Sequence, residues 1–230
     1  MTLPPGQRGV EGFPRFGTHF HAPAPIVPEG PQIAIAGAVV KPFSLPLTDL
    51  ATLPRRELTA DLHCVAGWSA TDLRWEGVPF ETFYRQVIEP SIRRGSAVTH
   101  FVFAGLDGYR SYVMIEDAMA EDVLIAQHLD GRPLDSDHGA PARLVSPSQY
   151  GFVSVKHLCR IEARTGEPAD DYHPNATLQL GLRLVKPHPR ARVWREERHR
   201  YLPARAVRPL YRLLIPPIRA LSARGSRRAP

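Results

Sequence analysis

Prolines divide the apolar stretches of this 230-residue sequence into short runs, and this division narrows the range of folds that the chain can adopt. The 24 prolines are about twice the average share, which favours loops and short elements over long helices. The run 33–40, for example, lies between Pro31 and Pro42 and has the composition of a strand. No run approaches the roughly 20 apolar residues of a membrane-spanning helix. We therefore expect one domain with a packed core, built largely from short strands.

Apolar periodicity predicts the individual elements. Helical spacing is present over residues 79–88, and a short helix is predicted over residues 116–120. Strands are predicted over residues 33–40, 57–65, 98–103, 112–114, 123–128, 142–145, 153–161 and 177–185, with a short strand and a helical turn over 44–53. Strands and helices do not alternate regularly, and the sequence has no glycine-rich phosphate-binding loop. These patterns predict an α+β fold in which β-structure dominates.

Positive charge is concentrated near the C-terminal end. The net charge of +6 divides into +10 for residues 190–230, which hold 12 arginines and two glutamates, and −4 for the remainder. We divide the chain into an extended N-terminal arm (1–30), a central domain (31–187) and an Arg-rich tail (188–230). In the tail, residues 204–214 have the spacing of an amphipathic helix that Pro209 interrupts.

The tail has several interpretations. It could dock on an anionic membrane surface, dock on an acidic redox partner, or contact nucleic acid without specificity. It could also be a strap packed on the domain, with a solvated arginine-rich end. Nucleic acid is the weakest of these interpretations, because no recognition module accompanies the charge.

The N-terminal residues and the cysteines indicate a compartment. Residues 1–17 contain neither an apolar signal core nor a twin-arginine pair, so we expect a cytoplasmic location. Cys64 and Cys159 are too few for a disulfide framework. In a reducing compartment, each is either a small buried residue or a thiolate with a chemical role.

Cys64 is the first candidate for chemistry. It lies in residues 63–69 (HCVAGWS), where the predicted strand 57–65 runs into a loop that contains Gly67. A thiolate at such a position suits a metal or a nucleophilic reaction. Taken alone, a cysteine is more often a buried small residue. A cysteine hydrolase is a remote third interpretation, because no nucleophile signature surrounds Cys64.

A second group of candidates lies about 75 residues further along the chain. Residues 137–145 (DHGAPARLV) and 149–156 (QYGFVSVK) place His138, Arg143 and Lys156 among glycine, proline and serine. Cationic side chains beside exposed backbone N–H groups form an anion site, and a phosphate ester is the obvious ligand. Each of the three residues taken singly would be an ordinary loop or surface residue.

Together, these segments resemble the molybdopterin-binding domain of the sulfite oxidase family. The resemblance rests on the Cys64 loop, on H-G-A-P-A-R at 138–143, on S-V-K at 154–156 and on F-A-G-L-D at 103–107, and it covers about 21–185. It implies an oxidoreductase with a molybdenum–molybdopterin cofactor and with Cys64 as the protein ligand of the metal. It also implies that the pterin and its phosphate are held by His21, Asp107, His138, Arg143, Ser154, Val155 and Lys156.

Departures from the family pattern narrow the expected activity. The cysteine loop has no arginine before Arg74, unlike the sulfite-binding loops of the family, and its C-V-A-G-W-S form is more similar to the methionine-sulfoxide reductases of the same family. We therefore expect two-electron oxygen-atom transfer with a neutral, sulfoxide-like substrate. Only 45 residues follow Val185, so we expect neither the immunoglobulin-like dimerisation domain nor a heme domain, and we expect a separate electron-transfer partner. The alternative is a non-catalytic pterin- or partner-binding module that docks through its basic tail.

Overall fold

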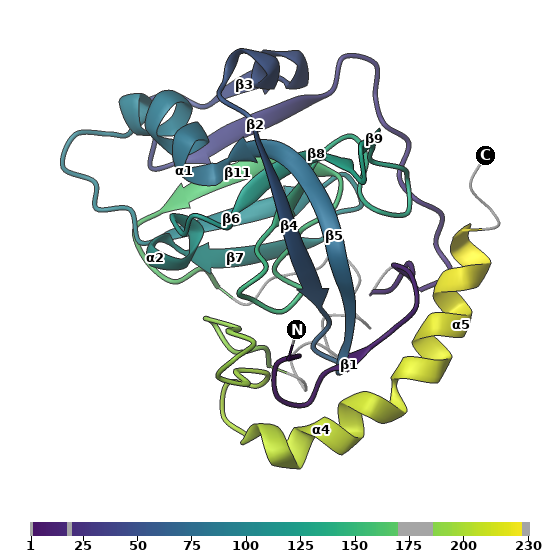
Figure 1. Ribbon diagram of the computed structural model, residues 1–230. Helices are drawn as coiled ribbons and strands as arrows, with labels where there is room; N and C mark the ends of the chain where they lie inside the picture. Colours follow the sequence, from purple (N-terminus) through teal and green to yellow (C-terminus); the bar gives the residue numbers. More distant parts are fainter. Residues whose placement is uncertain (1, 18–19, 170–185, 227–230) are drawn as a thin grey trace.

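Two β-sheets form the body of the protein in the computed structural model, which describes residues 2–17, 20–169 and 186–226 (Figure 1). Sheet A contains β1 (Arg8–Gly9), β4 (Arg56–His63), β5 (Trp68–Pro79), β8 (Leu124–Leu129), β9 (Arg132–Pro133) and β10 (Arg143–Val145). Sheet B contains, in spatial order, β3 (Phe43–Pro46), β2 (Gln32–Gly37), β11 (Leu158–Arg164), β6 (His100–Gly105) and β7 (Arg110–Met114). Most strand pairs are antiparallel, while β1 with β5 and β2 with β11 are parallel.

Helices are few and mostly short. They are a 3₁₀ turn (Leu47–Thr52), α1 (Phe80–Phe83) with a π turn (Tyr84–Ile88) and a second 3₁₀ turn (Glu89–Ser91), α2 (Ile115–Ala118), α4 (Ala204–Leu213) and α5 (Ile215–Ser226). The predicted β-dominated α+β fold is therefore confirmed. The described residues 186–226 form loops and two helices instead of an immunoglobulin-like sandwich.

The predicted strand over residues 153–161 is wrong in its first half. Residues 153–157 form a loop, and the strand β11 begins at Leu158. In this loop the Ser154 carbonyl accepts a hydrogen bond from Arg143 instead of from a neighbouring strand, and His157 has a left-handed backbone with φ of 54°. The predicted strand over residues 177–185 lies outside the described residues.

Sequence patterns do not indicate β5, a strand of 12 residues. Its pattern is broken by Asp72, which has φ of 58°, and by a register shift at Gly77. A Cβ at Gly77 would lie 2.1 Å from the Ile125 carbonyl oxygen, so only glycine allows β5 and β8 to approach there. The strand pairs with β1, β4 and β8 and forms the centre of sheet A.

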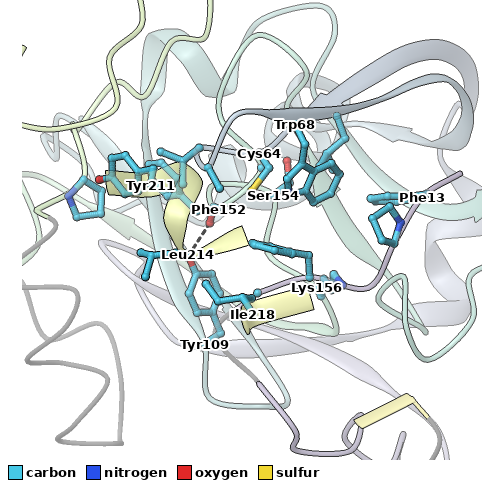
Figure 2. A pocket seen from close by; sticks show the side chains of 18 of the residues that line it. Phe13, Cys64, Trp68, Tyr109, Phe152, Ser154, Lys156, Tyr211, Leu214 and Ile218 are labelled. Carbon is cyan, nitrogen blue, oxygen red and sulfur yellow. Dashed lines mark hydrogen bonds between the residues drawn. The ribbon is translucent and has the colours of Figure 1, made fainter. Parts of the chain in front are cut away.

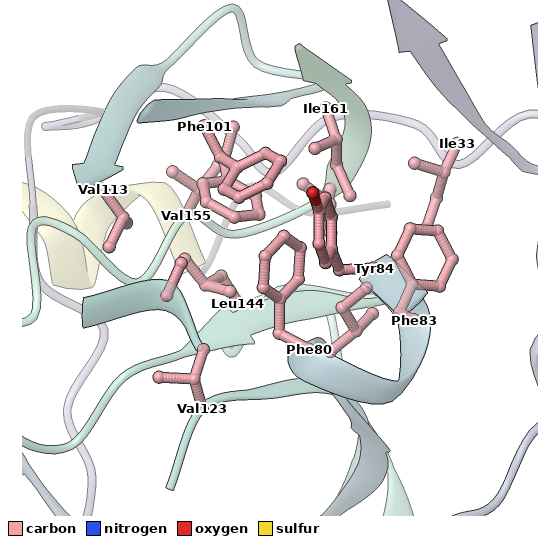
Figure 3. Close-up of a cluster of buried hydrophobic side chains, with 14 of the residues drawn as sticks. Ile33, Phe80, Phe83, Tyr84, Phe101, Val113, Val123, Leu144, Val155 and Ile161 are labelled. Carbon is pink, nitrogen blue, oxygen red and sulfur yellow. The ribbon is translucent and has the colours of Figure 1, made fainter. Parts of the chain in front are cut away.

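The main hydrophobic core lies between the two sheets and α1 (Figure 3). Phe80 on α1 stacks edge-on against Phe101 and Phe103 of β6, with ring centroids 5.0 and 5.2 Å apart. All three rings are fully buried, and burying a side chain of this size contributes roughly 1.5–3 kcal/mol. This core holds the two sheets together, and the loops that carry Cys64 and Lys156 extend from the strands of these sheets.

The opposite face of sheet A carries a second apolar cluster. Along β8, Ile125 points into the main core, whereas Leu124 and Ala126 point into the second cluster, which also contains Cys64 and Trp75. The N-terminal arm covers this cluster with Val10, Phe13 and Phe16, and α5 covers it with Ile215. In Figure 1, α4 and α5 run along the outer edge of the molecule below β1 and the end of β5. The arm and the C-terminal helices therefore meet beside Cys64.

No helix within the described ranges has both the length and the apolar character that crossing a membrane requires.

Candidate active site

The loop between β4 and β5 holds Cys64 in a fixed position. The Cys64 N–H donates to the Trp68 carbonyl at 2.8 Å, and the Gly67 N–H donates to the Cys64 carbonyl at 2.9 Å. Gly67 has φ of +105°, a conformation that favours glycine. From the N-terminal arm, the Gln7 side-chain amide also donates to the Cys64 carbonyl at 3.1 Å. Backbone bonds on both sides thus fix the direction of the Cys64 side chain.

The Cys64 side chain lies in an apolar environment at the cavity wall. Burial raises the pKa of the Cys64 thiol to about 12, although the nearby positive charge of Arg198 acts in the opposite direction. At neutral pH the free side chain is therefore a thiol. A bound metal ion would displace this proton, because metals bind the thiolate form.

Cys64 opens into a cavity of about 240 Å³ (Figure 2). In this view Cys64 and Trp68 lie on one side of the cavity, with Tyr109, Lys156 and Ile218 on the other. The Tyr109 hydroxyl donates to the Phe152 carbonyl at 2.7 Å. Phe152 and Tyr211 also line the wall, and the N-terminal arm adds Phe13, Phe16 and Phe20. The cavity is thus largely aromatic and apolar, with a few polar groups that converge on it.

Arg143 and Lys156 bring two positive charges to one end of this cavity. A Cβ at Gly139 would lie 3.1 Å from the Cβ of Lys156 and 3.2 Å from that of Arg143, so the glycine lets both residues pack against this loop. Arg143 is 1% exposed and donates to the carbonyl oxygens of His138 and Ser154. Lys156 is half-buried, and its Nζ donates to the Asp137 carbonyl at 2.6 Å.

Neither cation pairs with a carboxylate within the part of the chain that the structure describes. Burial lowers the pKa of Arg143 to about 9. Burial, together with the positive charges of Arg143 and Arg15, lowers the pKa of Lys156 to about 7. The charges of Asp137 and Asp107 offset this lowering only in part, so two cations without an ion-pair partner remain unfavourable in the cavity until an anion binds. The electrostatics therefore indicate an anionic ligand at this end.

The lowered pKa of Lys156 predicts how the ligand-free protein responds to pH. Its pKa is about 7 in the folded chain and 10.5 in the unfolded chain, so the unfolded state binds more protons between these values. The free energy of unfolding should therefore rise as the pH rises from about 7 to about 9. Denaturant titrations of ligand-free wild type and Lys156→Met across this range test this. We expect a smaller rise in the variant, and equal slopes in the two proteins would contradict the assignment.

The other residues predicted to bind the cofactor divide into two groups. Asp107 and Ser154 line the cavity together with Cys64, Arg143 and Lys156. His21, His138 and Val155 do not line the cavity. His21 is exposed in the arm, and Val155 is buried in the main core. His138 lies behind Phe13: its Nε2 donates to the Phe13 carbonyl at 2.8 Å and its Nδ1 lies 2.8 Å from Asp135.

The segments at the two ends of the chain supply wall residues that sequence patterns do not identify. Arg198 is fully buried, donates to the Val65 carbonyl of the cysteine loop and stacks 4.8 Å above the Tyr150 ring. From α4 and α5 come Tyr211, Leu214 and Ile218. The helical spacing over 204–214 is the signal that could have placed Tyr211, since Tyr211 follows Val207 by four residues on the buried face.

Two neutral buried donors in the wall have no hydrogen-bond partner among the residues described. They are the indole N–H of Trp68 and the hydroxyl of Tyr211. A buried donor without an acceptor is costly, and a ligand with acceptor atoms would satisfy both. In residues 2–17, 20–169 and 186–226, no cluster of three or more His, Cys, Asp or Glu residues could hold a metal ion by itself. A metal bound by Cys64 would therefore need further ligands from a bound organic cofactor.

A family model and several curated relatives match this chain, and their names describe oxidoreductases or reductases. A family model described as the oxidoreductase molybdopterin binding domain matches residues 19–172. The uncharacterized oxidoreductase YuiH of Bacillus subtilis is 29% identical over 70% of this chain and 78% of its own length. The protein-methionine-sulfoxide reductase catalytic subunit MsrP of Pseudomonas syringae pv. tomato is 31% identical over 86% of this chain and 64% of its own length.

Other matches agree with these. MsrP of Xanthomonas campestris pv. campestris is 30% identical over 66% of this chain, and the chain covers only 50% of that protein. Among solved structures, the sulfane dehydrogenase SoxCD from Paracoccus pantotrophus matches with a TM-score of 0.51 and 24% identity, over 59% of this chain and 38% of the matched chain. The SoxCD match supports the fold alone.

Proposed function

The chain belongs to the oxidoreductase molybdopterin-binding domain family, and we propose that it transfers an oxygen atom in a two-electron reaction at a molybdenum–molybdopterin centre bound by Cys64. One observation carries this proposal. The cations Arg143 and Lys156 follow Cys64 by 79 and 92 residues, yet all three residues line one cavity. A soft thiolate ligand and an anion site in one cavity are what a metal held by a phosphorylated organic group requires.

The residues present fit the cofactor at its phosphate end. Arg143 and Lys156 form no ion pair with a described carboxylate, and a phosphate would pair with both and favour their charged forms. Ser154 and Asp107 lie in the same wall and would hydrogen-bond the pterin. The unpartnered indole N–H of Trp68 is a further donor for its acceptor atoms. We infer that these residues bind and orient the group.

His21, His138 and Val155 take more indirect roles in this proposal. His138 fixes the arm by its hydrogen bond to the Phe13 carbonyl, and the Phe13 ring lies in the cavity wall. Val155 keeps the neighbouring Ser154 and Lys156 in place through its buried side chain. His21 is exposed, so a contact between His21 and the cofactor would need a movement of the arm.

When bound, the cofactor supplies a metal that takes up or gives away two electrons as an oxygen atom moves to or from the substrate. The chain contributes the position of Cys64, which backbone hydrogen bonds on both sides hold. It also contributes an aromatic wall that excludes water from the space beside the sulfur. A separate protein would supply the electrons, in line with the name of the MsrP relatives as catalytic subunits.

The wall beside Cys64 favours a neutral substrate over an oxyanion. Its side chains there are apolar or aromatic, including Val65, Trp68 and Phe152. Arg198 lines the cavity beside the cysteine loop, but it is 0% exposed and already bonded to the Val65 carbonyl. Among the described residues of the cavity wall, a dianion such as sulfite would therefore find no free cation beside Cys64. A sulfoxide, the group named in the MsrP relatives, has no net charge.

Substrate turnover tests this proposal. Protein made in cells that synthesise the cofactor should contain close to one molybdenum per chain. It should reduce methionine sulfoxide with a viologen dye at least about tenfold faster than it oxidises sulfite with ferricyanide. Protein that binds pterin but turns over neither sulfoxides, N-oxides nor sulfite would instead be the non-catalytic module. Protein with neither molybdenum nor pterin would refute the cofactor assignment.

A further inference from the structure

The C-terminal segment carries a concentration of exposed apolar side chains. Six of the nine large apolar side chains that are exposed in the described residues lie between 194 and 214. They are Trp194, Tyr201, Leu202, Leu210, Leu213 and Leu214. We call this set the apolar strip. Scattered exposed leucines are ordinary, but such a concentration within about 20 residues indicates an interaction surface.

Positive charge surrounds the apolar strip. The described residues 186–226 contain ten arginines and one lysine, against Glu196 and Glu197 alone. Glu196 pairs with Arg208, and Glu197 lies 3.6 Å from His188 and accepts a backbone N–H. Both carboxylates are therefore engaged within the segment. The surface that the segment presents to solvent is accordingly cationic.

The helix α4 has both buried and exposed side chains. Val207 and Tyr211 are buried against the body of the protein. Arg205, Leu210 and Leu213 of the same helix are exposed, and Leu213 is 73% exposed. Figure 1 shows α4 and α5 on the outer edge of the molecule. α4 and α5 thus form a convex outer edge that carries Leu210, Leu213 and Leu214 of the apolar strip, with arginines on the same helices.

We propose that α4 and the start of α5 dock on an anionic lipid surface, with the leucines among the acyl chains and the arginines against the headgroups. Leucine and aromatic side chains next to arginine, without free carboxylates, are the composition of helices that bind in the plane of a membrane. A flexible lipid surface accommodates a convex ridge, whereas a protein partner would need a matching groove. Because Leu214 belongs to both the strip and the cavity wall, docking places the cavity beside the lipid.

Vesicle flotation with the full-length protein tests the docking site. The protein should float with vesicles that contain phosphatidylglycerol, float little with phosphatidylcholine alone, and be released by salt. Leu213→Asp should weaken binding by about tenfold or more, because an apolar anchor is lost. Val40→Asp is the matched control, since Val40 is also 73% exposed but lies just after β2, and Figure 1 shows β2 far from α4.

Charge reversal gives a second, independent comparison. Arg205→Glu, on the exposed side of α4, should weaken binding to anionic vesicles by about tenfold, and Arg94→Glu, exposed in the loop before β6, should not. Thermal unfolding of each variant verifies that the fold is kept. Equal binding by Leu213→Asp and Val40→Asp, equal binding to neutral and anionic vesicles, or binding to an acidic protein with none to lipid would each overturn the proposal. The outcome does not depend on the cofactor or on turnover.

Discussion

The Cys64→Ser variant is expected to lose oxygen-atom transfer by more than about 100-fold while it keeps its fold. Loss of an outer hydrogen-bond partner already costs a metal site roughly 10–100-fold, and Cys64 is proposed as the sole protein ligand. The structural effect should be small, because serine has almost the same shape and the loop is held through backbone atoms of Cys64. We expect the free energy of unfolding to change by about 1 kcal/mol. Sulfoxide turnover and thermal unfolding of the purified variant measure the two effects.

Cys159→Ser is the control for this experiment. Cys159 is partly buried on β11, and its Sγ lies 3.5 Å from the Ala104 carbonyl, outside the cavity wall. Its replacement should leave turnover within about twofold of wild type. A Cys64→Ser protein that turns over sulfoxide at the wild-type rate would remove Cys64 from the centre of the account.

The Lys156→Met variant is expected to lose the cofactor without losing the fold. Removal of one member of a buried, hydrogen-bonded charge pair costs about 2–5 kcal/mol, which corresponds to a loss in affinity of roughly 30-fold or more. In the cofactor-free chain the same change removes a charge that burial and neighbouring cations already disfavour. The cofactor-free variant should therefore be at least as stable as the cofactor-free wild type. Weaker cofactor binding without a loss of stability in the cofactor-free chain is the result expected for a residue whose role is to bind an anionic ligand.

Molybdenum and pterin content after gel filtration, together with thermal unfolding, distinguish these outcomes. Lys41→Met is the matched control, because Lys41 is an exposed lysine outside the cavity wall. It should retain the cofactor fully. Full cofactor retention by Lys156→Met, or a loss of stability in its cofactor-free form, would show that Lys156 is a structural residue.

The part of the site that follows strand ends could be predicted from the sequence. Cys64 follows β4, and Arg143 begins β10, so each has a position that apolar alternation defines. The structure brings both to the same cavity with Lys156. The alternation of Val153 and Val155 with polar residues predicts a strand over the loop 153–157. The loop is instead held by the Arg143 side chain, which donates to the Ser154 carbonyl, and by the His157 N–H, which donates to the Gly139 carbonyl.

The remaining wall could not be predicted because tertiary packing alone places it. Phe13 lies in a proline- and glycine-rich arm without periodicity, and the carbonyl of the same residue is held by His138 from 125 residues away. In the sequence Arg198 is one of many arginines of the tail, and only its burial against Tyr150 in the structure distinguishes it from the others. Both lie outside the residues 19–172 that match the family model. The proposed cofactor end thus lies within the range that matches the family model, whereas much of the outer wall comes from the arm and the tail outside that range. The cytoplasmic location stays a prediction.

Molybdenum K-edge X-ray absorption of the purified protein is the most direct test of the claim that Cys64 binds the metal. In the proposed site, two sulfur ligands come from the pterin and one from Cys64. The wild-type spectrum should therefore require one more sulfur neighbour than the spectrum of Cys64→Ser, at equal molybdenum loading. The same sulfur count in the two spectra would contradict the account.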